Sequence, residues 1–415
     1  MKYVDSSWDF RKSDTKRATH CFHAYPAMMI PQIAEKLLTK YAPNANLLFD
    51  PYCGTGTSLV EANIKNINAI GTDLNPLARL IAESKTTNLD IQQLDLYLKD
   101  FNDFVFQFQF GIAINKASIV SPTFKNIDFW FNKTAKTKLA IIKTYIDKIN
   151  HSDIKKFFLT AFSETIRESS LTKKGEFKLV RIPEEKRLKF NPDCFGIMLY
   201  KLSRNKKGLV EFSEIKRNGA VSEIHGFNTV KSIPKEVMED ESVDVVVTSP
   251  PYGDSRTTVA YGQYSRLSNQ WMGIENAPQI DNELMGGKTN KTSKVNGSTV
   301  LNLAIEKIGD KDEKRATEVL TFFDDYQKSI NNLAKKMKRN KYACYVVGNR
   351  TVKDEKIPMD EITKNFFEAN NFKHIETIVR NIPNKRMPSE NSPTNQVGKK
   401  SSTMKQEYIV VMQKQ

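Results

Sequence analysis

Hydrophobic residues along this chain follow two alternating patterns. Short apolar runs, of which VDVVV at residues 243–247 is the clearest, have the length and β-branched content of buried strands. Two earlier runs of this kind lie at residues 47–49 and 69–71. Each is followed by a stretch in which apolar residues recur every three or four positions, at 59–64 and 77–84. Strands that alternate with helices predict an α/β fold with a doubly wound, mostly parallel sheet.

The run at 243–247 ends in the hexapeptide TSPPYG, residues 248–253. Proline has a fixed φ and no backbone donor, so the Pro-Pro pair must end the strand and leave a stiff loop. Open α/β sheets bind their ligands at the carboxyl ends of the strands. The hexapeptide is therefore a candidate ligand site, although an ordinary turn can have the same composition.

A long insertion separates the second predicted strand from the third, which we expect at 221–228. Apolar residues in 131–170 recur at helical spacing, which predicts two packed helices joined by a turn at 151–153. No internal repeat is visible. We expect three regions along the chain: 1–97, the first part of a catalytic domain; 98–220, an inserted helical and basic region; and 221–415, the second part, with a variable loop at 275–320 and a terminal hairpin.

The composition limits the class of protein. With 415 residues, of which 39% are hydrophobic, the chain can bury a large core. It contains no run of eighteen apolar residues, and residues 1–17 lack the apolar core of a signal peptide, so we expect a cytoplasmic protein without a membrane partner. The four cysteines are scattered without a C-x-x-C pair, which predicts reduced thiols and no metal.

The net charge of +15 suggests a polyanionic partner. Lysine and arginine are spread over the whole chain, and nucleic acid is the common partner of a basic globular protein. The alternative is that the lysines only form a solvated surface.

The first motif with chemical content is DPYCGTGT, residues 50–57, directly after the first predicted strand. Small residues let the backbone approach a ligand, and the amino end of the following helix adds oriented N–H groups. The loop therefore suits a nucleotide-type ligand. It is not a P-loop, because no Gly-Lys-Ser/Thr follows, and it is not a complete G-x-G-x-x-G.

A carboxylate, Asp73, lies at the end of the second predicted strand. Such a carboxylate commonly accepts hydrogen bonds from a ribose diol, and its alternative role is to cap a helix. Asn75 precedes Pro76, which suits the start of the helix at 77–84. We expect Asp73 to bind the ribose of the ligand and Asn75 to begin the helix.

These motifs resemble those of the S-adenosylmethionine-dependent methyltransferases that modify exocyclic amino groups of DNA bases. DPYCGTGT resembles their cofactor loop, GTDLNPLA (71–78) their ribose-binding segment and TSPPY (248–252) their catalytic loop. Three further segments match in order: HAYPAMMIPQIAEKLL (23–38), which precedes the cofactor loop and closes over the methionine end; a later core strand at 342–352; and a terminal hairpin at 380–412. The family implies a seven-stranded sheet, S-adenosylmethionine as cofactor and double-stranded DNA as partner.

The resemblance also assigns roles to residues. The target amino nitrogen is a poor nucleophile, and by resemblance the Ser249 side chain and the Pro250 carbonyl accept hydrogen bonds from its protons. Pro251 stiffens the loop, and Tyr252 stacks on a base flipped out of the duplex. The implied cofactor residues are Tyr25, Pro26, Asp50, Pro51, Cys53, Gly54, Gly56, Thr57, Asp73, Leu74, Asn75 and Asn228.

The first position of the catalytic loop indicates the target base. In the family, serine there is associated mainly with N4-cytosine products, and aspartate or asparagine mainly with N6-adenine. Ser249 therefore predicts a cytosine-N4 enzyme, with adenine N6 as the alternative. C5 methylation needs a nucleophilic thiolate, usually in a Pro-Cys pair, and the chain has no such pair. We expect Cys53 to pack in the cofactor loop.

Two other functions stay open. An RNA guanine-N2 methyltransferase has a similar cofactor loop and a Pro-Pro-Tyr loop, but usually carries an amino-terminal RNA-binding module. The cofactor loop here begins by residue 50, which leaves no room for that module. A DNA-binding subunit without catalysis would have damaged motifs, whereas all of them are intact.

Candidate DNA contacts lie in three basic stretches. In the first, basic residues alternate with aromatic ones at 173–190, as on a phosphate-contacting surface, and a solvated loop is the alternative. The expected contacts are Lys173, Lys174, Arg181, Arg187, Arg256, Lys385 and Arg386. The helical stripe of Tyr261, Tyr264 and Leu267 is expected in the core. The family suggests a bacterial restriction-modification system, with a cognate endonuclease acting separately.

Overall fold

An eight-stranded sheet forms the centre of the computed structural model, which describes residues 1–111, 119–216, 219–254, 259–382, 390–391, 401–402 and 404–415. Every neighbouring pair of strands is parallel except the two pairs that β12 makes, with β6 and β9. The order is β1 (Lys2–Val4), β9 (Phe372–Asn381), β12 (Gln406–Lys414), β6 (Met337–Val347), β5 (Val243–Thr248), β2 (Leu47–Asp50), β3 (Asn68–Thr72) and β4 (Ser222–His225). The predicted doubly wound, mostly parallel sheet is confirmed.

The sheet has one strand more than the seven we expected. The additional strand is β1, three residues that pair in parallel with β9 at the edge, where Tyr3 lies opposite Ile378. The segment 2–4 has no apolar run of its own, so its pattern gave no strand signal. The expected strands at 47–49, 69–71, 221–228 and 243–247 correspond to β2, β3, β4 and β5.

Helices cover both faces of the sheet. Alternate residues of the central strands point to opposite faces: Leu48 and Val245 pack with α1 (Pro31–Tyr41) and α2 (Thr57–Ile64), whereas Phe49 and Val246 pack with α13 (Glu313–Lys336) and α14 (Met359–Glu368). Burial on both faces explains why β5 is apolar at consecutive positions from Val245 to Val247. α3 (Pro76–Thr86) lies beside β4 and carries the helical layer described next.

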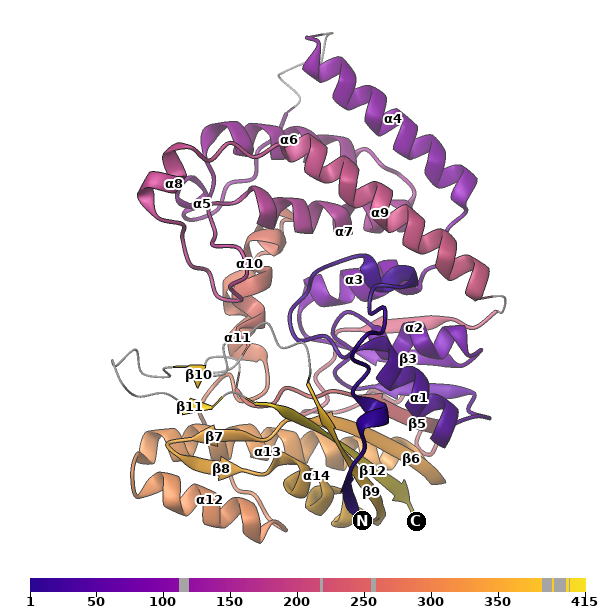
Figure 1. Cartoon of the computed structure of the whole chain (residues 1–415), viewed down its shortest axis with the longest axis vertical. Helices are drawn as coiled ribbons and strands as arrows, with labels where there is room; N and C mark the ends of the chain where they lie inside the picture. The colour runs from indigo at the N-terminus through magenta and orange to yellow at the C-terminus, as the bar shows by residue number, and fades with distance from the viewer. Residues whose placement is uncertain (112–118, 217–218, 255–258, 383–389, 392–400, 403) are drawn as a thin grey trace.

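The insertion forms a second helical layer above α3 (Figure 1). Its core, which contains Leu139, Phe158 and Met198, is separate from the two cores against the sheet. The two helices predicted for 131–170 are confirmed as α6 and α7, and His151 caps α7 by accepting a hydrogen bond from the Ile154 amide at 3.4 Å. The helices are α4 (Ile91–Gln109), α5 (Ile127–Trp130), α6 (Lys133–Asp147), α7 (Ser152–Ser169), α8 (Glu184–Leu188) and α9 (Cys194–Ile215), joined by α10 (Tyr261–Trp271).

Two expected boundaries differ from the structure. The insertion was expected to begin at residue 98, but 98 lies inside α4, whose apolar face continues from Leu94 to Val105. The stretch 275–320 is not one variable loop, because α12 and the start of α13 lie in it. The remaining elements are η1 (Ser6–Trp8), η2 (Ala18–Cys21), η4 (Ala277–Gln279), α11 (Ile280–Glu283), α12 (Thr299–Gly309), β7 (Arg350–Val352), β8 (Glu355–Ile357), β10 (Glu390–Asn391) and β11 (Ser401–Ser402).

The carboxyl-terminal hairpin is formed by β9 and β12, which pair antiparallel as predicted. Its register places Arg380 directly opposite Glu407. Within the described residues, no helix is both long and apolar enough to cross a membrane.

Candidate active site

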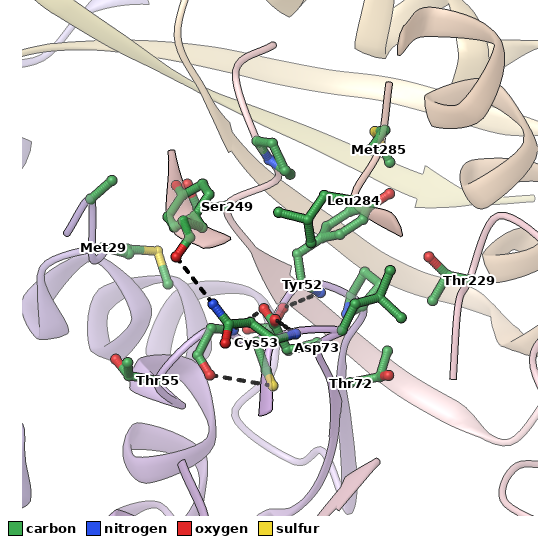
Figure 2. A pocket seen from close by; sticks show the side chains of 18 of the residues that line it. Met29, Tyr52, Cys53, Thr55, Thr72, Asp73, Thr229, Ser249, Leu284 and Met285 are labelled. Atoms are coloured by element: carbon green, nitrogen blue, oxygen red, sulfur yellow. Dashed lines mark hydrogen bonds between the residues drawn. The ribbon is translucent and has the colours of Figure 1, made fainter. Parts of the chain in front are cut away.

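A cavity opens at the carboxyl ends of β2, β3 and β5, where the fold predicts a ligand site. Figure 2 shows Ser249 and Met29 on one side, Leu284 and Thr229 on the other, and Asp73 and Cys53 between them. The space inside the cavity, counted together with its open mouth, is about 1000 Å³. Eleven of the twelve expected cofactor residues line it: Tyr25, Pro26, Asp50, Pro51, Cys53, Gly54, Thr57, Asp73, Leu74, Asn75 and Asn228.

Gly56 is the expected cofactor residue that does not line the cavity. Its φ is +77°, and a Cβ there would lie 3.0 Å from the Cβ of Ala82 on α3. Gly56 therefore lets the loop turn left-handed into α2 while α3 packs close behind it.

Asp50 ends β2 beneath the cavity. Its carboxylate accepts hydrogen bonds from the Tyr52 amide at 3.1 Å, from the Thr248 hydroxyl at 2.5 Å and from the Ser58 hydroxyl. Burial raises the pKa of Asp50 to about 6, against the opposing effect of these donors. Asp50 thus joins the cofactor loop to the strand that carries the catalytic loop.

Asp73 lies at the end of β3 and faces the cavity. It accepts hydrogen bonds from the Gly54 amide at 3.1 Å and the Asn75 amide at 2.8 Å, which hold it against the cofactor loop. Burial raises the pKa of this carboxyl, while the two amides lower it. A carboxylate has about four acceptor sites, so Asp73 keeps acceptor capacity for the hydroxyls of a ligand.

Asn75 caps α3 by accepting a hydrogen bond from the Leu77 amide at 3.1 Å, as its place before Pro76 predicted. Its amide nitrogen donates to the Tyr25 hydroxyl at 2.9 Å and to the Ser265 hydroxyl at 3.0 Å. One side chain therefore connects α3, the segment before α1 and α10.

The segment 23–29 covers one side of the cavity and is held by the helical insertion. Glu164 of α7 accepts a hydrogen bond from the Ala24 amide at 3.1 Å and forms ion pairs with Arg204 at 2.8 Å and Lys201 at 3.2 Å. The Tyr264 hydroxyl donates to the Ala24 carbonyl at 2.8 Å. The insertion is thus fixed directly to the wall of the cavity.

Several lining residues were not identified from the sequence. Tyr261 lines the cavity and stacks on Tyr25 with ring centroids 6.0 Å apart, while Tyr264 and Leu267 are buried as expected. The others are Ala27, Met28, Met29, Tyr52, Thr55, Ser58, Thr72, Phe227, Thr229, Val230, Leu284 and Met285. Six of them lie inside the three motif segments at 23–38, 50–57 and 71–78, which was the available signal, whereas Leu284 and Met285 come from a segment without a distinctive motif.

The catalytic loop follows β5 at the mouth of the cavity. Ser249 and Pro251 line the cavity, whereas Pro250 is buried behind them. The Tyr252 hydroxyl lies 3.2 Å from the Ser249 hydroxyl and donates to Glu407 of β12 at 3.1 Å. The loop is therefore fixed both by its prolines and by a side chain from the terminal hairpin.

Cys53 has the environment of an inert thiol. It is buried, and burial raises the pKa of its thiol well above the usual value, with Asp73 and Asp50 adding to the shift. A thiol that stays protonated at neutral pH is a poor nucleophile.

Four of the expected DNA contacts lie on or beside the loop between α7 and α8. Lys174 is exposed, Lys173 forms an ion pair with Glu176 at 3.2 Å, and Arg187 forms one with Glu184 at 3.5 Å. Arg181 lies over the Phe129 ring at 4.0 Å. The segment that carries them, residues 173–187, lies beside α5 and α8 (Figure 1), and we call these four residues the basic surface. The other three, Arg256, Lys385 and Arg386, lie outside the described residues.

Two relatives give the comparison that bears on function. The chain is 41% identical, over 97% of its length and 92% of the relative's, to the type II methyltransferase M.MvaI of Kocuria varians. A second relative, the type II methyltransferase M.MjaII of Methanocaldococcus jannaschii, is 32% identical over 34% of this chain and 27% of its own. No family model matches the chain.

The similarity to one solved structure is remote. The rRNA methyltransferase aviRa of Streptomyces viridochromogenes aligns with 94% of this chain and 88% of its own, at 11% identity and a TM-score of 0.33. A TM-score of that size supports no statement about function.

Proposed function

The chain belongs to the type II methyltransferases, and from this we propose that it transfers a methyl group from S-adenosylmethionine to N4 of cytosine in double-stranded DNA. The observation that carries the proposal is that Ser249 of the catalytic loop lines the same cavity as Asp73 and Gly54 of the cofactor segments. A methyl donor bound by the cofactor segments and an amino group held by Ser249 would meet within one cavity.

The lining residues fit S-adenosylmethionine. Asp73 offers carboxylate acceptors to a ribose diol, and the apolar side chains of Phe227, Val230 and Met285 suit a flat adenine ring. The segment with Tyr25 and Pro26 would cover the methionine end. When bound, this cofactor supplies an electrophilic methyl group on a sulfonium.

The chain's own residues supply orientation and acceptors. The cytosine amino nitrogen is conjugated with its ring, so acceptors for its two protons raise its reactivity. Ser249 and the Pro250 carbonyl would accept these hydrogen bonds from a loop that is already rigid, so no reorganisation is needed during the reaction. The aromatic ring of Tyr252 would stack on the flipped base.

Two observations favour an amino group over ring carbon C5 and cytosine over adenine. The Cys53 thiol is buried and its pKa is raised, which disfavours the covalent attack that C5 chemistry requires. Serine at the first loop position favours cytosine over adenine by its resemblance to the N4-cytosine enzymes. The net charge of +15 and the basic surface beside α8 support DNA as the partner. The similarity to a type II methyltransferase supports a role in a restriction-modification system.

The test is methyl transfer from labelled S-adenosylmethionine to unmethylated plasmid DNA, with bulk RNA in a parallel reaction. We expect label in DNA as N4-methylcytosine, and its loss in Ser249→Ala with unchanged cofactor affinity. Thr137→Val is the control, because the Thr137 hydroxyl bonds only within the exposed face of α6. N6-methyladenine would assign the enzyme to adenine, and label in RNA alone would refute DNA as the substrate.

A further inference from the structure

The Tyr252 hydroxyl lies between a serine hydroxyl and a carboxylate. On one side, at 3.2 Å, is the hydroxyl of Ser249, and on the other, at 3.1 Å, is a carboxylate oxygen of Glu407. Glu407 lies on β12 directly opposite Arg380 of β9, and the two form a close ion pair. A continuous row of polar groups therefore runs from the sheet to the proposed catalytic serine.

Arg380 fixes the far end of this row. Its Nε donates to the Trp8 carbonyl at 2.8 Å and its Nη2 to the Asp9 carbonyl at 3.3 Å, while Nη1 donates to Glu407. The guanidinium is buried and each of its nitrogens is engaged. Glu407 is consequently held in place by a cation that itself cannot rotate.

The row has only one consistent arrangement of protons. A carboxylate has no proton, so the Tyr252 hydroxyl must donate to Glu407. Burial raises the pKa of Tyr252 well above its usual value, so this proton is present at neutral pH. The single phenolic proton is then used, and in the contact between Ser249 and Tyr252 the serine must be the donor.

We propose that Glu407, held by Arg380, is a positioning residue that makes Ser249 a hydrogen-bond acceptor toward the substrate. A serine hydroxyl has one proton and two lone pairs. With its proton directed to Tyr252, its lone pairs are left for the amino group of the target base, and its proton cannot turn toward that group. Hydrogen bonds in series also polarise one another, which makes Ser249 a stronger acceptor. The inference rests on the proposed role of Ser249.

The variant Glu407→Gln is expected to reverse the row. Arg380 has donors only, so it retains the amide oxygen of the glutamine and leaves the amide nitrogen to face Tyr252. Tyr252 then accepts from that nitrogen and donates to Ser249, whose own proton turns toward the substrate. We expect the single-turnover rate constant to fall about a hundredfold to a thousandfold, the range given for the loss of one preorganised hydrogen bond. The KM for DNA and the affinity for S-adenosylmethionine should stay within a factor of two.

A matched control is Glu376→Gln. Glu376 of β9 also accepts a hydrogen bond from a tyrosine, Tyr3 at 2.8 Å, and forms an ion pair with a lysine, Lys40 at 2.6 Å, but lies away from the cavity. Its substitution should alter thermal stability without lowering the single-turnover rate constant.

A double-mutant cycle separates positioning from a merely structural role. Tyr252→Phe removes the hydroxyl while leaving the ring and the pair of Glu407 with Arg380 in place. By itself it should lower kcat, because the Ser249 hydroxyl is then free to rotate. In this background Glu407→Gln should change kcat by less than a factor of two.

Two outcomes of this cycle would overturn the proposal. Equal losses from Glu407→Gln in both backgrounds would make its role structural, and an unchanged kcat in Tyr252→Phe would remove the connection even if Glu407→Gln did not fold. Failure of the proposed function would differ from both, because Ser249→Ala would then retain the full rate.

Discussion

The Thr248 hydroxyl donates a 2.5 Å hydrogen bond to the Asp50 carboxylate, which connects the last residue of β5 with the last residue of β2. Thr248 is followed at once by the catalytic loop, and Asp50 opens the cofactor loop. The two halves of the proposed site are thus joined at the carboxyl ends of two neighbouring central strands, inside the buried core. The ionisation of Asp50 should therefore affect the stability of the fold.

The free energy of unfolding should contain a pH-dependent contribution from Asp50. Its pKa is raised to about 6 in the folded protein, so between about pH 4 and pH 6 the folded state holds a proton that the unfolded chain has lost. This contribution is fully present near pH 4 and is lost as the pH rises through 6, by about 3 kcal/mol for two pKa units.

Urea denaturation of the wild type and of Asp50→Asn at pH 4.5 and 7.5 measures this effect. The stability of the wild type relative to the variant should be higher at pH 4.5. A difference that stays constant, or that increases with pH, would contradict the assigned ionisation.

Gly348, just after β6, lies against the ring of Tyr252. A Cβ at this position would be 2.6 Å from Cδ2 of Tyr252 and would also overlap Sδ of Met404. Gly348→Ala should therefore displace Tyr252 and lower kcat at least tenfold, with little change in cofactor affinity. The control is Gly309→Ala, where the nearest atom to the new Cβ is 3.8 Å away. Equal activities of the two variants would show that the position of Tyr252 is unimportant.

Glu164 should control cofactor affinity from the helical insertion. It is buried and accepts from the Ala24 amide, next to Tyr25 in the cavity wall. Glu164→Gln leaves Arg204 without its counter-charge and should weaken S-adenosylmethionine binding about tenfold, the effect of losing a buried charged hydrogen bond. Glu168→Gln is the matched control, because Glu168 pairs with the same Lys201 but is partly exposed. Calorimetry on both variants makes the comparison, and equal affinities would refute the connection.

The basic surface between α7 and α8 should contribute to DNA binding through charge. Lys174→Glu should raise the dissociation constant for DNA. It should also reduce the slope of log affinity against log salt by about 1 for each phosphate that the protein no longer neutralises. The control is Lys373→Glu, an exposed lysine at the amino end of β9, on the edge of the sheet away from the cavity. A salt titration of both variants is the measurement. Indistinguishable slopes would place the DNA elsewhere.

The sequence was sufficient for the parts of the molecule that rest on local patterns. Buried runs and glycine-rich turns predicted β2, β3 and β5, and three- and four-residue spacing predicted α6 and α7. Most of the expected cofactor residues form one cavity because they follow β2, β3 or β4, and parallel strands end on the same side of a sheet. Tyr25 and Pro26 instead come from the segment before α1.

Contacts between distant segments could not be predicted in this way. β1 forms only because three residues at the amino end find the free edge of β9, about 370 positions away. The pairing of Glu407 with Arg380 depends on the hairpin register, and the contact of Glu164 with Ala24 depends on how the insertion packs. None of these leaves a periodic signal in the chain, which is why the residues that hold the catalytic loop and cavity wall were missed.

Identification of the methylated nucleoside tests the central claim most directly. Plasmid DNA without prior methylation is treated with the protein and S-adenosylmethionine, digested to nucleosides and examined by mass spectrometry, with Ser249→Ala in parallel. The proposed account predicts N4-methylcytosine from the wild type and none from the variant. N6-methyladenine or C5-methylcytosine as the product, or N4-methylcytosine formed equally by Ser249→Ala, would contradict it.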